Sequence, residues 1–356
     1  CPICACSYND VYDHAMSEQI SVGIIGASGY TGAELLRLAA QHPNFDMCLA
    51  TGDSMAGRRA ADLYPSLVGA YPDLVFESFD AAAAEGLDLV FLGLPHEASM
   101  ELAPQLVGKV GCIVDLSAAY RLRDTAQYPE FYGFEHTQTG LLAEAVYGLP
   151  EFHREHLKGA QLIATPGCHV TAAALALKPL VDAGLIATSG ISVNSLTGIT
   201  GAGRTATEVN MFTSIDSNAR AYGLLNHRHT PEIEQEIGAQ VLFTPHHVPM
   251  NRGILATCTA PATNAASANA VMAALNDCYV NEPFVSVIER PPETKSVLGS
   301  NAAHVSARYD ARTGTVVAMC AIDNLTKGAS GGAVQAANVA LGIDEAAGLT
   351  TVGVAP

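Results

Sequence analysis

The chain has 356 residues, enough for two domains that each bury a hydrophobic core. Hydrophobic residues make up 49% and charged residues 15%, a composition typical of a globular protein that argues against a disordered one. The 35 acidic and 18 basic residues give a formal net charge of −17, which argues against nucleic acid and anionic membranes as partners. A small anionic substrate stays compatible, because its site needs only two or three local cations.

The first fifteen residues precede Met16 and a strand-like stretch, so we interpret 1–15 as a leader or appended segment. Cys1, Cys4 and Cys6 have a spacing that can hold zinc or an iron–sulfur cluster, but a fourth ligand is not evident. The other cysteines are mostly scattered singly within apolar stretches, which suits a reducing cytoplasm. The sequence shows no apolar run near the ~20 residues of a membrane span and no secretory signal pattern. We therefore expect a cytoplasmic protein without a metal.

Residues 16–164 are predicted to form a dinucleotide-binding domain. The segment "ISVGIIGASGYTGAELLRL" indicates a strand, a glycine turn and a helix, and "FDMCLAT", "LDLVFLGLP" and "GCIVDLSA" indicate further strands. Apolar strands that alternate with helical segments are typical of a parallel sheet covered on both faces, as in a Rossmann-type α/β fold.

The glycine turn "GASGYTG" follows the first strand and opens the first helix, where dinucleotides bind in such folds. Glycines let the backbone approach a pyrophosphate, whose charge then lies at the helix N-terminus. The spacing differs from the usual G-x-G-x-x-G, and a tight turn without a ligand is the alternative. The predicted cofactor-binding residues of this turn are Gly26, Ser28, Gly29, Tyr30, Thr31 and Gly32.

The ends of the next strands are expected to meet the rest of the cofactor. Asp53 favours the free ribose hydroxyl of NAD, whereas Arg58 and Arg59 favour the 2′-phosphate of NADP, so these residues leave the choice open. Pro95 and His96 end a later strand, at the edge of the sheet where ligands bind. Pro95 is expected to contact the cofactor, and His96 to line the nicotinamide site. The alternative for His96 is a solvated loop residue.

The stretch "IATPGCHVTAAALALKPL" places Cys168 at the start of an alanine-rich helix, directly after a proline-glycine turn. The first N–H groups of a helix have no partner within it, and the helix dipole places partial positive charge there. Both effects favour thiolate over thiol, so we expect Cys168 to have a lowered pKa and to act as a nucleophile.

Polar residues after two other segments are candidates for binding an anionic substrate. Ser117 and Arg121 follow a strand in "DLSAAYRLRD", and Arg204 follows the glycine-rich turn of "TGITGAGR". In a chain with few cations, arginines beside such loops suit carboxylate or phosphate groups. The alternative for each arginine is a surface residue.

The second half of the chain differs in pattern, with longer alternating strand-like runs and a hairpin turn in "RYDARTGTVV". It is predicted to be an α+β domain with a mixed sheet. Its segment "NHRHTPEIEQEI" places His227 and His229 before a helix, with Thr230 as the expected N-cap. Either histidine is a candidate acid–base partner of Cys168, and capping or surface histidines are the alternative. The position nearest the helix start favours His229.

Eight strings, ordered along residues 20 to about 343, resemble the N-acetyl-gamma-glutamyl-phosphate reductase family. They are "GASGYTGAELLRL", "DLSAAYRLRD", "YGLPE", "TPGCHVTAAALALKPL", "TGITGAGR", "YGLLNHRHTPEI", "FTPHHVPMNRGIL" and "DNLTKGASGGAVQAAN". One departure is the segment before Arg204, where the family more often has S-G-x-S-G-A-G-R.

The resemblance implies a fold like that of glyceraldehyde-3-phosphate dehydrogenase, with 165–324 as catalytic and oligomerisation domain and a helix in 325–343 packed back on the first domain. It implies an NADP-dependent phosphorylating aldehyde dehydrogenase that reduces an acyl phosphate through a thioester on Cys168. Asn324 is then expected to contact the cofactor, and the assembly to be a homodimer or homotetramer. Aspartate-semialdehyde dehydrogenase and a dinucleotide-sensing regulator are the competing interpretations.

Overall fold

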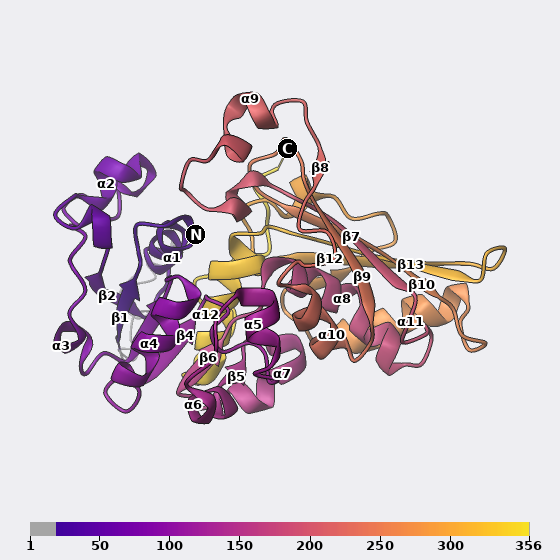
Figure 1. The fold of residues 1–356 in the computed structure, drawn as a ribbon, viewed down its shortest axis with the longest axis horizontal. Coiled ribbons are helices and arrows are strands. Elements are labelled where there is room, and N and C mark those ends of the chain that lie inside the picture. The colour runs from indigo at the N-terminus through magenta and orange to yellow at the C-terminus, as the bar shows by residue number, and fades with distance from the viewer. Residues whose placement is uncertain (1–18, 356) are drawn as a thin grey trace, which may run out of the picture.

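The computed structural model describes residues 19–355. The segment interpreted as a leader, with its alternative metal site, lies outside these residues. Within them the chain forms two sheets, joined by segments that cross between them twice (Figure 1). No helix in this described part is long and apolar enough to span a membrane.

The first sheet has six strands, all parallel, in the order β2-β1-β3-β4-β6-β5, which confirms the predicted Rossmann-type sheet. Its strands are β1 (Ile20–Ile25), β2 (Phe45–Ala50), β3 (Leu89–Leu92), β4 (Cys112–Asp115), β5 (Val146–Tyr147) and β6 (Leu162–Ala164). Strands β3, β4 and β6 are buried along their whole length, as expected when helices cover both faces.

Different helices cover the two faces of this sheet. Apolar side chains of α1 (Tyr30–Ala39) and of the C-terminal α12 (Gly331–Ala340) share one core cluster, and those of α4 (His96–Leu106) and α5 (Gln127–Tyr132) share the other. The remaining helices of this half are α2 (Ala60–Leu63), α3 (Ala81–Ala84), α6 (Thr139–Glu144), α7 (Pro150–Leu157) and the 3₁₀ turns η1 (Asp53–Met55) and η2 (Pro65–Leu67).

The second sheet has seven strands in the order β11-β12-β13-β10-β7-β9-β8. Neighbours pair antiparallel except β7 with β9 and β11 with β12, so the predicted mixed sheet is confirmed. The strands are β7 (Ile191–Thr197), β8 (Arg220–Ala221), β9 (Val241–His247), β10 (Ile254–Pro261), β11 (Val285–Val287), β12 (Ala303–Asp310) and β13 (Thr315–Ile322). Gly314, with φ of 62°, makes the predicted turn between β12 and β13.

Helices cover one face of the second sheet and leave the other without a helical layer (Figure 1). The covering helices are α8 (Cys168–Asp182), α10 (Thr230–Ile237) and α11 (Ala268–Tyr279), while α9 (Phe212–Ile215), η3 (Ile199–Ala202), η4 (Glu208–Asn210) and η5 (Thr294–Val297) lie in loops. Burial alternates along β7 and β10, and Leu196 and Leu242 on the uncovered face are 37% and 53% exposed. A half-covered sheet with exposed leucines is suited to contact with another chain.

The two crossings between the sheets lie side by side. The first runs from β6 into α8, and the second runs from β13 through a π-helical turn, η6 (Thr326–Ser330), into α12. A Cβ placed on Gly328 of η6 would lie 2.9 Å from the Cβ of Cys168, so the two segments are in van der Waals contact. π-Helical turns are rare and are frequent at functional sites.

Candidate active site

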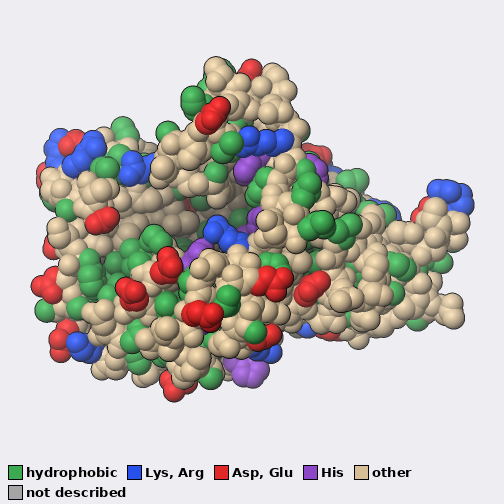
Figure 2. All heavy atoms as spheres, in the orientation of Figure 1, with side chains coloured by type: hydrophobic (Ala, Val, Ile, Leu, Met, Phe, Trp, Pro, Cys, Tyr) green, Lys and Arg blue, Asp and Glu red, His purple; other side chains and the backbone are tan. Residues whose placement is uncertain are grey.

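A cavity of about 300 Å³ lies between the two halves, at the carboxyl ends of the first sheet's strands. Figure 2 shows a hollow in this region with cationic and histidine side chains at its edge. The cavity joins residues from α1, α8, η3, η6 and the segment before α10. Of the predicted site residues, it is lined by Gly29, Tyr30, Thr31, His96, Arg121, Cys168, Arg204, His229 and Asn324.

Cys168 is the first residue of α8, and Gly167 is its N-cap with an extended backbone at φ −64° and ψ 145°. Burial raises the pKa of the Cys168 thiol, and the nearby Arg121, the His169 N–H and Arg228 oppose this only in part. The expectation of a lowered pKa is therefore wrong. Loss of hydration outweighs the helix terminus in this half-buried position.

His229 lies directly over the glycine that precedes Cys168. A Cβ placed on Gly167 would be 2.4 Å from His229 Nε2, so only glycine fits beneath the ring. His229 is buried, and this burial, together with neighbouring histidines and arginines, holds its pKa well below the usual range. Its imidazole is therefore neutral and has a ring nitrogen that can receive the thiol proton, and the same lowered pKa makes it a weaker base than a solvated histidine.

The helix that follows begins differently from the prediction. His229 itself is the N-cap of α10, with αR backbone and no side-chain capping bond, and Thr230 is the first helical residue. The proposed cap role of Thr230 is wrong. Proline at the first turn, Pro231, supplies the start of the helix by fixing φ instead.

His227 lies behind His229 and outside the residues that line the cavity. Its Nδ1 accepts a hydrogen bond from the His229 N–H at 3.1 Å, and the two rings meet edge to face with centroids 4.8 Å apart. Burial lowers the pKa of His227 to about 4, aided by Arg228 and His247. The geometry therefore distinguishes His229, which lines the cavity, from His227, which does not. The sequence had left the choice between these two histidines open.

His169, which the sequence analysis did not single out, completes a cluster with these two histidines. Their ligating nitrogens lie within 4.8 Å of one another, a spacing seen in metal sites. The two nitrogens of His169 are already hydrogen-bonded, Nδ1 with the Ser195 hydroxyl at 2.7 Å and Nε2 with the Tyr222 hydroxyl at 2.9 Å. These two hydrogen bonds fix the orientation of the His169 ring, and the catalytic candidates pack against it.

Glu232 is a second residue that sequence reasoning missed. It is fully buried, and its Oε1 accepts the Gly167 N–H at 2.9 Å and the Tyr147 hydroxyl at 2.8 Å. Its Oε2 lies 3.5 Å from Nη1 of Arg121. Glu232 thus ties α10 to the Cys168 turn and to a predicted substrate-binding arginine. Its spacing, three residues after His229 on one helix, is the signal that could have indicated it.

Arg228, which lies between His227 and His229 in the sequence, also lines the cavity. Its Nη1 lies 3.0 Å from His96 Nε2, and His96 Nδ1 accepts the Ala118 N–H at 2.9 Å. Burial, with Arg228 and Arg121 nearby, lowers the pKa of His96 to about 3, so this ring is neutral. The site therefore holds three arginines rather than the two predicted.

Several predicted residues lie outside the cavity lining. Ser117 is buried, donates its hydroxyl to Asp115 at 2.8 Å and accepts the Ala119 N–H at 3.0 Å, so its side chain is already committed. Arg59 pairs with Asp62 at 2.8 Å. The others not among the lining residues are Gly26, Ser28, Gly32, Arg58 and Pro95.

Three of these residues shape the glycine turn instead. A Cβ on Gly26 would lie 2.4 Å from the Gly93 carbonyl oxygen, and one on Gly32 would lie 2.5 Å from the Ala27 Cα. Ser28 donates its hydroxyl to the Gly52 carbonyl at 3.1 Å. These contacts hold the turn close to its neighbouring strands.

The N-terminus of α1 fits a dinucleotide pyrophosphate. Gly29 is the N-cap without a side-chain capping bond, and the first turn carries no acidic residue. A Cβ on Gly29 would find its nearest heavy atom, the Gly26 carbonyl oxygen, at 3.7 Å, so the space on the Cβ side of Gly29 is open. Open N–H groups at a helix N-terminus bind anionic phosphates.

Buried polar contacts hold η6 in place beside Cys168. The ammonium of Lys327 contacts Glu151 at 2.5 Å and Gln335 at 2.6 Å, and all three side chains are buried. Lys327 thereby lowers the pKa of Glu151 against the opposing effect of burial. Breaking such a buried pair by removing one partner costs about 3–5 kcal/mol.

Comparison with known proteins decides the family. Residues 21–160 match the semialdehyde dehydrogenase NAD binding domain, and residues 168–324 match the semialdehyde dehydrogenase dimerisation domain. An N-acetyl-gamma-glutamyl-phosphate reductase of Symbiobacterium thermophilum is 43% identical over 94% of this chain and 98% of its own length. One of Moorella thermoacetica is 41% identical over 95% of this chain and its whole length. The chain belongs to the N-acetyl-gamma-glutamyl-phosphate reductase family.

Solved structures show the same fold at low sequence identity. Aspartate semialdehyde dehydrogenase II of Vibrio cholerae, complexed with ASA, superposes with a TM-score of 0.68 at 18% identity, over 91% of this chain and 98% of that chain. The Candida albicans enzyme with NADP gives a TM-score of 0.67 at 18% identity, over 90% and 98%. At this identity the likeness supports the fold, and the family follows from the closer sequences.

Proposed function

We propose that the chain reduces N-acetyl-gamma-glutamyl phosphate to N-acetylglutamate semialdehyde and phosphate, with NADPH as reductant. The observation that carries the proposal is one cavity that joins Cys168, His229 and three arginines to the open N-terminus of α1. A nucleophile, a base, anion-binding groups and a dinucleotide-binding turn are the parts that reductive acyl transfer requires.

In the first step, neutral His229 accepts the thiol proton and the Cys168 thiolate attacks the acyl carbon. Phosphate leaves with the electrons of its C–O bond, and a thioester remains on the sulfur. Arg121 and Arg228 favour the thiolate, since both lower the pKa of Cys168. Sulfur suits this role because a thioester accepts hydride far more readily than a carboxylate does.

NADPH, when bound, supplies the hydride that reduces the thioester carbon. The first N–H groups of α8, next to Cys168, are suited to stabilise the oxyanion that then forms. The C–S bond breaks to give the aldehyde, and the protonated His229 returns its proton to the departing sulfur. The residues proposed to hold the cofactor are Gly26, Ser28, Gly29, Tyr30, Thr31, Gly32, Arg58, Arg59, Pro95 and Asn324.

The substrate carries two anionic groups, a phosphate and a carboxylate, and the cavity offers Arg121, Arg204 and Arg228. Planar guanidinium groups bind both kinds of oxyanion through paired hydrogen bonds. We propose that these arginines divide the two groups between them. Ser117 acts through Asp115 and the turn that carries Arg121, since its hydroxyl is occupied.

We further propose a homodimer or homotetramer in the cytoplasm, built on the uncovered face of the second sheet. The exposed Leu196 and Leu242 on that face, and the match of this region to a dimerisation domain, support the assembly. The described cysteines are all free, which suits a reducing compartment. Light scattering coupled to gel filtration tests the assembly, and Leu242→Arg is expected to reduce the mass.

The substrate is tested in the oxidative direction. NADP⁺ reduction is measured with saturating phosphate and either N-acetylglutamate semialdehyde or aspartate semialdehyde. The proposal expects kcat/KM at least 100-fold higher for the N-acetylated substrate and no turnover without phosphate. Equal or reversed preference would overturn the substrate assignment, and phosphate-independent turnover would overturn the acyl-phosphate chemistry.

A further inference from the structure

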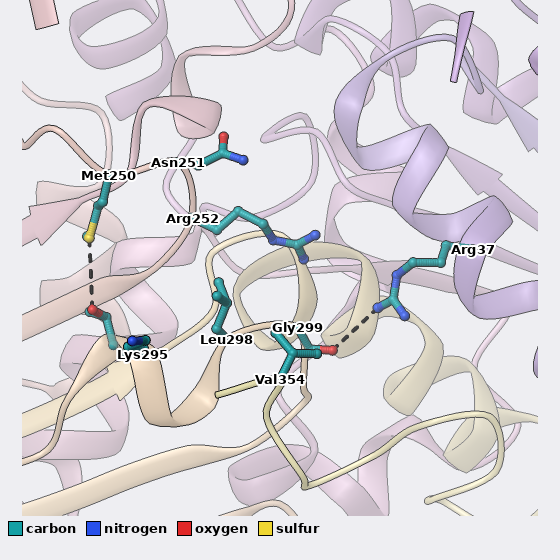
Figure 3. A pocket seen from close by; sticks show the side chains of 9 residues that line it. Arg37, Met250, Asn251, Arg252, Lys295, Leu298, Gly299 and Val354 are labelled. Carbon is teal, nitrogen blue, oxygen red and sulfur yellow. Dashed lines mark hydrogen bonds between the residues drawn. The ribbon is translucent and has the colours of Figure 1, made fainter. Parts of the chain in front are cut away.

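A second cavity, of about 490 Å³, lies at the seam between the two halves and away from the catalytic cysteine. Its walls come from α1, the loop between β9 and β10, the η5 region and the C-terminal tail (Figure 3). The lining side chains that matter here are Arg37, Met250, Arg252, Lys295, Leu298 and Val354.

Cations exceed carboxylates around this cavity. Arg37 pairs with Glu34 at 2.6 Å, and Arg252 pairs with both Glu34 and Asp323 at 2.9 Å. Lys295 is exposed and forms no ion pair with the residues that the structure describes. The residues that line the cavity therefore include three cations and no carboxylate, in a chain whose overall charge is −17. The seam is a local site of positive charge on an acidic protein, which favours an anionic ligand.

The rest of the lining is apolar. Leu298, Met250 and Val354 offer aliphatic and thioether surface beside the cations (Figure 3). Pockets for small molecules combine such surface with a few placed polar groups. We infer that the seam cavity is a binding site for a small organic anion, one carboxylate, sulfonate or phosphate group on an apolar body, and that its occupancy is coupled to the active site.

The coupling follows from a shared wall. The Asn251 carbonyl, on the loop that lines the seam cavity, accepts the Thr200 hydroxyl at 2.8 Å and the Thr200 N–H at 3.2 Å. Asn324 Nδ2 donates to the same Thr200 hydroxyl at 3.0 Å. Thr200 and Asn324 both line the active-site cavity. A shift of the loop therefore moves residues against the cofactor and substrate.

The seam also joins the two halves directly. Arg37 extends from α1, whose N-terminus is the dinucleotide site, and its Nη2 lies 3.5 Å from the Gly299 carbonyl across the cavity (Figure 3). Arg252 links Glu34 of α1 to Asp323, the residue before Asn324. An anion bound between these arginines competes with their carboxylate partners. Such a ligand changes cofactor affinity, and the cofactor changes the ligand's affinity by the same factor.

The test uses 8-anilinonaphthalene-1-sulfonate, a fluorescent anion with an apolar body, titrated into the full chain with saturating NADP⁺ so that the cofactor site is filled. Lys295→Gln removes the unpaired cation. Val354→Trp fills the cavity from the exposed tail, where folding tolerates a large side chain. Lys109→Gln, at another exposed lysine, is the matched control.

We expect the probe to bind Lys295→Gln at least fivefold and Val354→Trp at least tenfold more weakly than wild type, with Lys109→Gln within twofold. Equal affinity in all four proteins overturns the site. The probe should also change the KM for NADPH at least twofold in wild type and leave it unchanged in Val354→Trp. An unchanged KM in wild type, or the same change in both proteins, overturns the coupling.

Discussion

Two helices of this protein, α1 and α8, begin with the same local motif, but the surroundings of their N-termini differ. Both α1 and α8 follow a parallel strand, and both have a glycine N-cap, Gly29 and Gly167, with extended backbone and no side-chain capping bond. Around Gly29 the nearest atom to an added Cβ is 3.7 Å away. Around Gly167 the His229 ring lies at 2.4 Å from such a Cβ, and Glu232 accepts the glycine N–H.

The difference separates binding from catalysis. An open helix N-terminus leaves N–H groups free for a phosphate that arrives with the cofactor. An enclosed helix N-terminus surrounds the nucleophile with a base, a carboxylate and arginines, and these groups hold the nucleophile in one geometry. The same local motif thus serves two purposes, and the neighbours decide which.

The largest expected effect comes from removing the nucleophile at the enclosed terminus. Cys168→Ser is expected to lower kcat by about 10⁴-fold or more, because a hydroxyl stays protonated where a thiol can ionise. The Kd for NADP⁺, measured by fluorescence quenching, should stay within twofold of wild type, because the open terminus is untouched. Turnover within tenfold of wild type would contradict the nucleophilic role.

The next effect distinguishes the two histidines at the enclosed terminus. His229→Asn is expected to lower kcat by about 10²–10⁴-fold, the usual contribution of a positioned acid–base group. His227→Asn should change kcat less, because His227 acts through its hydrogen bond to the His229 backbone. Steady-state kinetics with saturating phosphate measures both. If both variants keep kcat within threefold, neither moves the proton, and His96 or a water becomes the candidate.

A matched pair of glycine substitutions tests the comparison itself. Gly167→Ala forces a Cβ against the His229 ring, and displacing that ring is expected to lower kcat by about 10²-fold. Gly29→Ala has room for the methyl group, so kcat should stay within threefold while the KM for NADPH rises less than tenfold. Thermal melting of both variants controls for folding. Equal losses of kcat would mean that the enclosure at Gly167 has no catalytic consequence.

The last prediction concerns pH, and its effect is about tenfold per pH unit. Because burial raises the pKa of Cys168, the thiol is protonated at neutral pH in the free enzyme, and only deprotonation makes it reactive. We measure the alkylation of Cys168 by iodoacetamide with peptide mass spectrometry. Its rate should increase about tenfold per pH unit from pH 6.5, and the increase should continue beyond the ordinary thiol pKa of about 8.5. NADP⁺ binding at the open terminus should change less than twofold between pH 7 and 9. A plateau of alkylation already at pH 7 would show a thiolate instead.

The sequence by itself determined the features that depend on local backbone chemistry. Gly29 and Cys168 each stand where an apolar strand gives way to a helical pattern, so the two helix termini, and the parallel and mixed sheets around them, were predicted correctly. The motifs around Cys168 and His229 also indicated the family, which the relatives confirm.

Only the tertiary structure decided which side chains meet at these termini. Glu232 contacts Gly167, which lies 65 residues away in the sequence, and Arg228 contacts His96, which lies 132 residues away. Ser117, placed correctly after its strand, faces Asp115 because both are buried together. The thiol pKa of Cys168 depends on hydration, which its helix position does not set, and burial reversed the expected direction. Local propensity acts over a few residues, whereas desolvation and long-range pairing depend on the whole packed molecule.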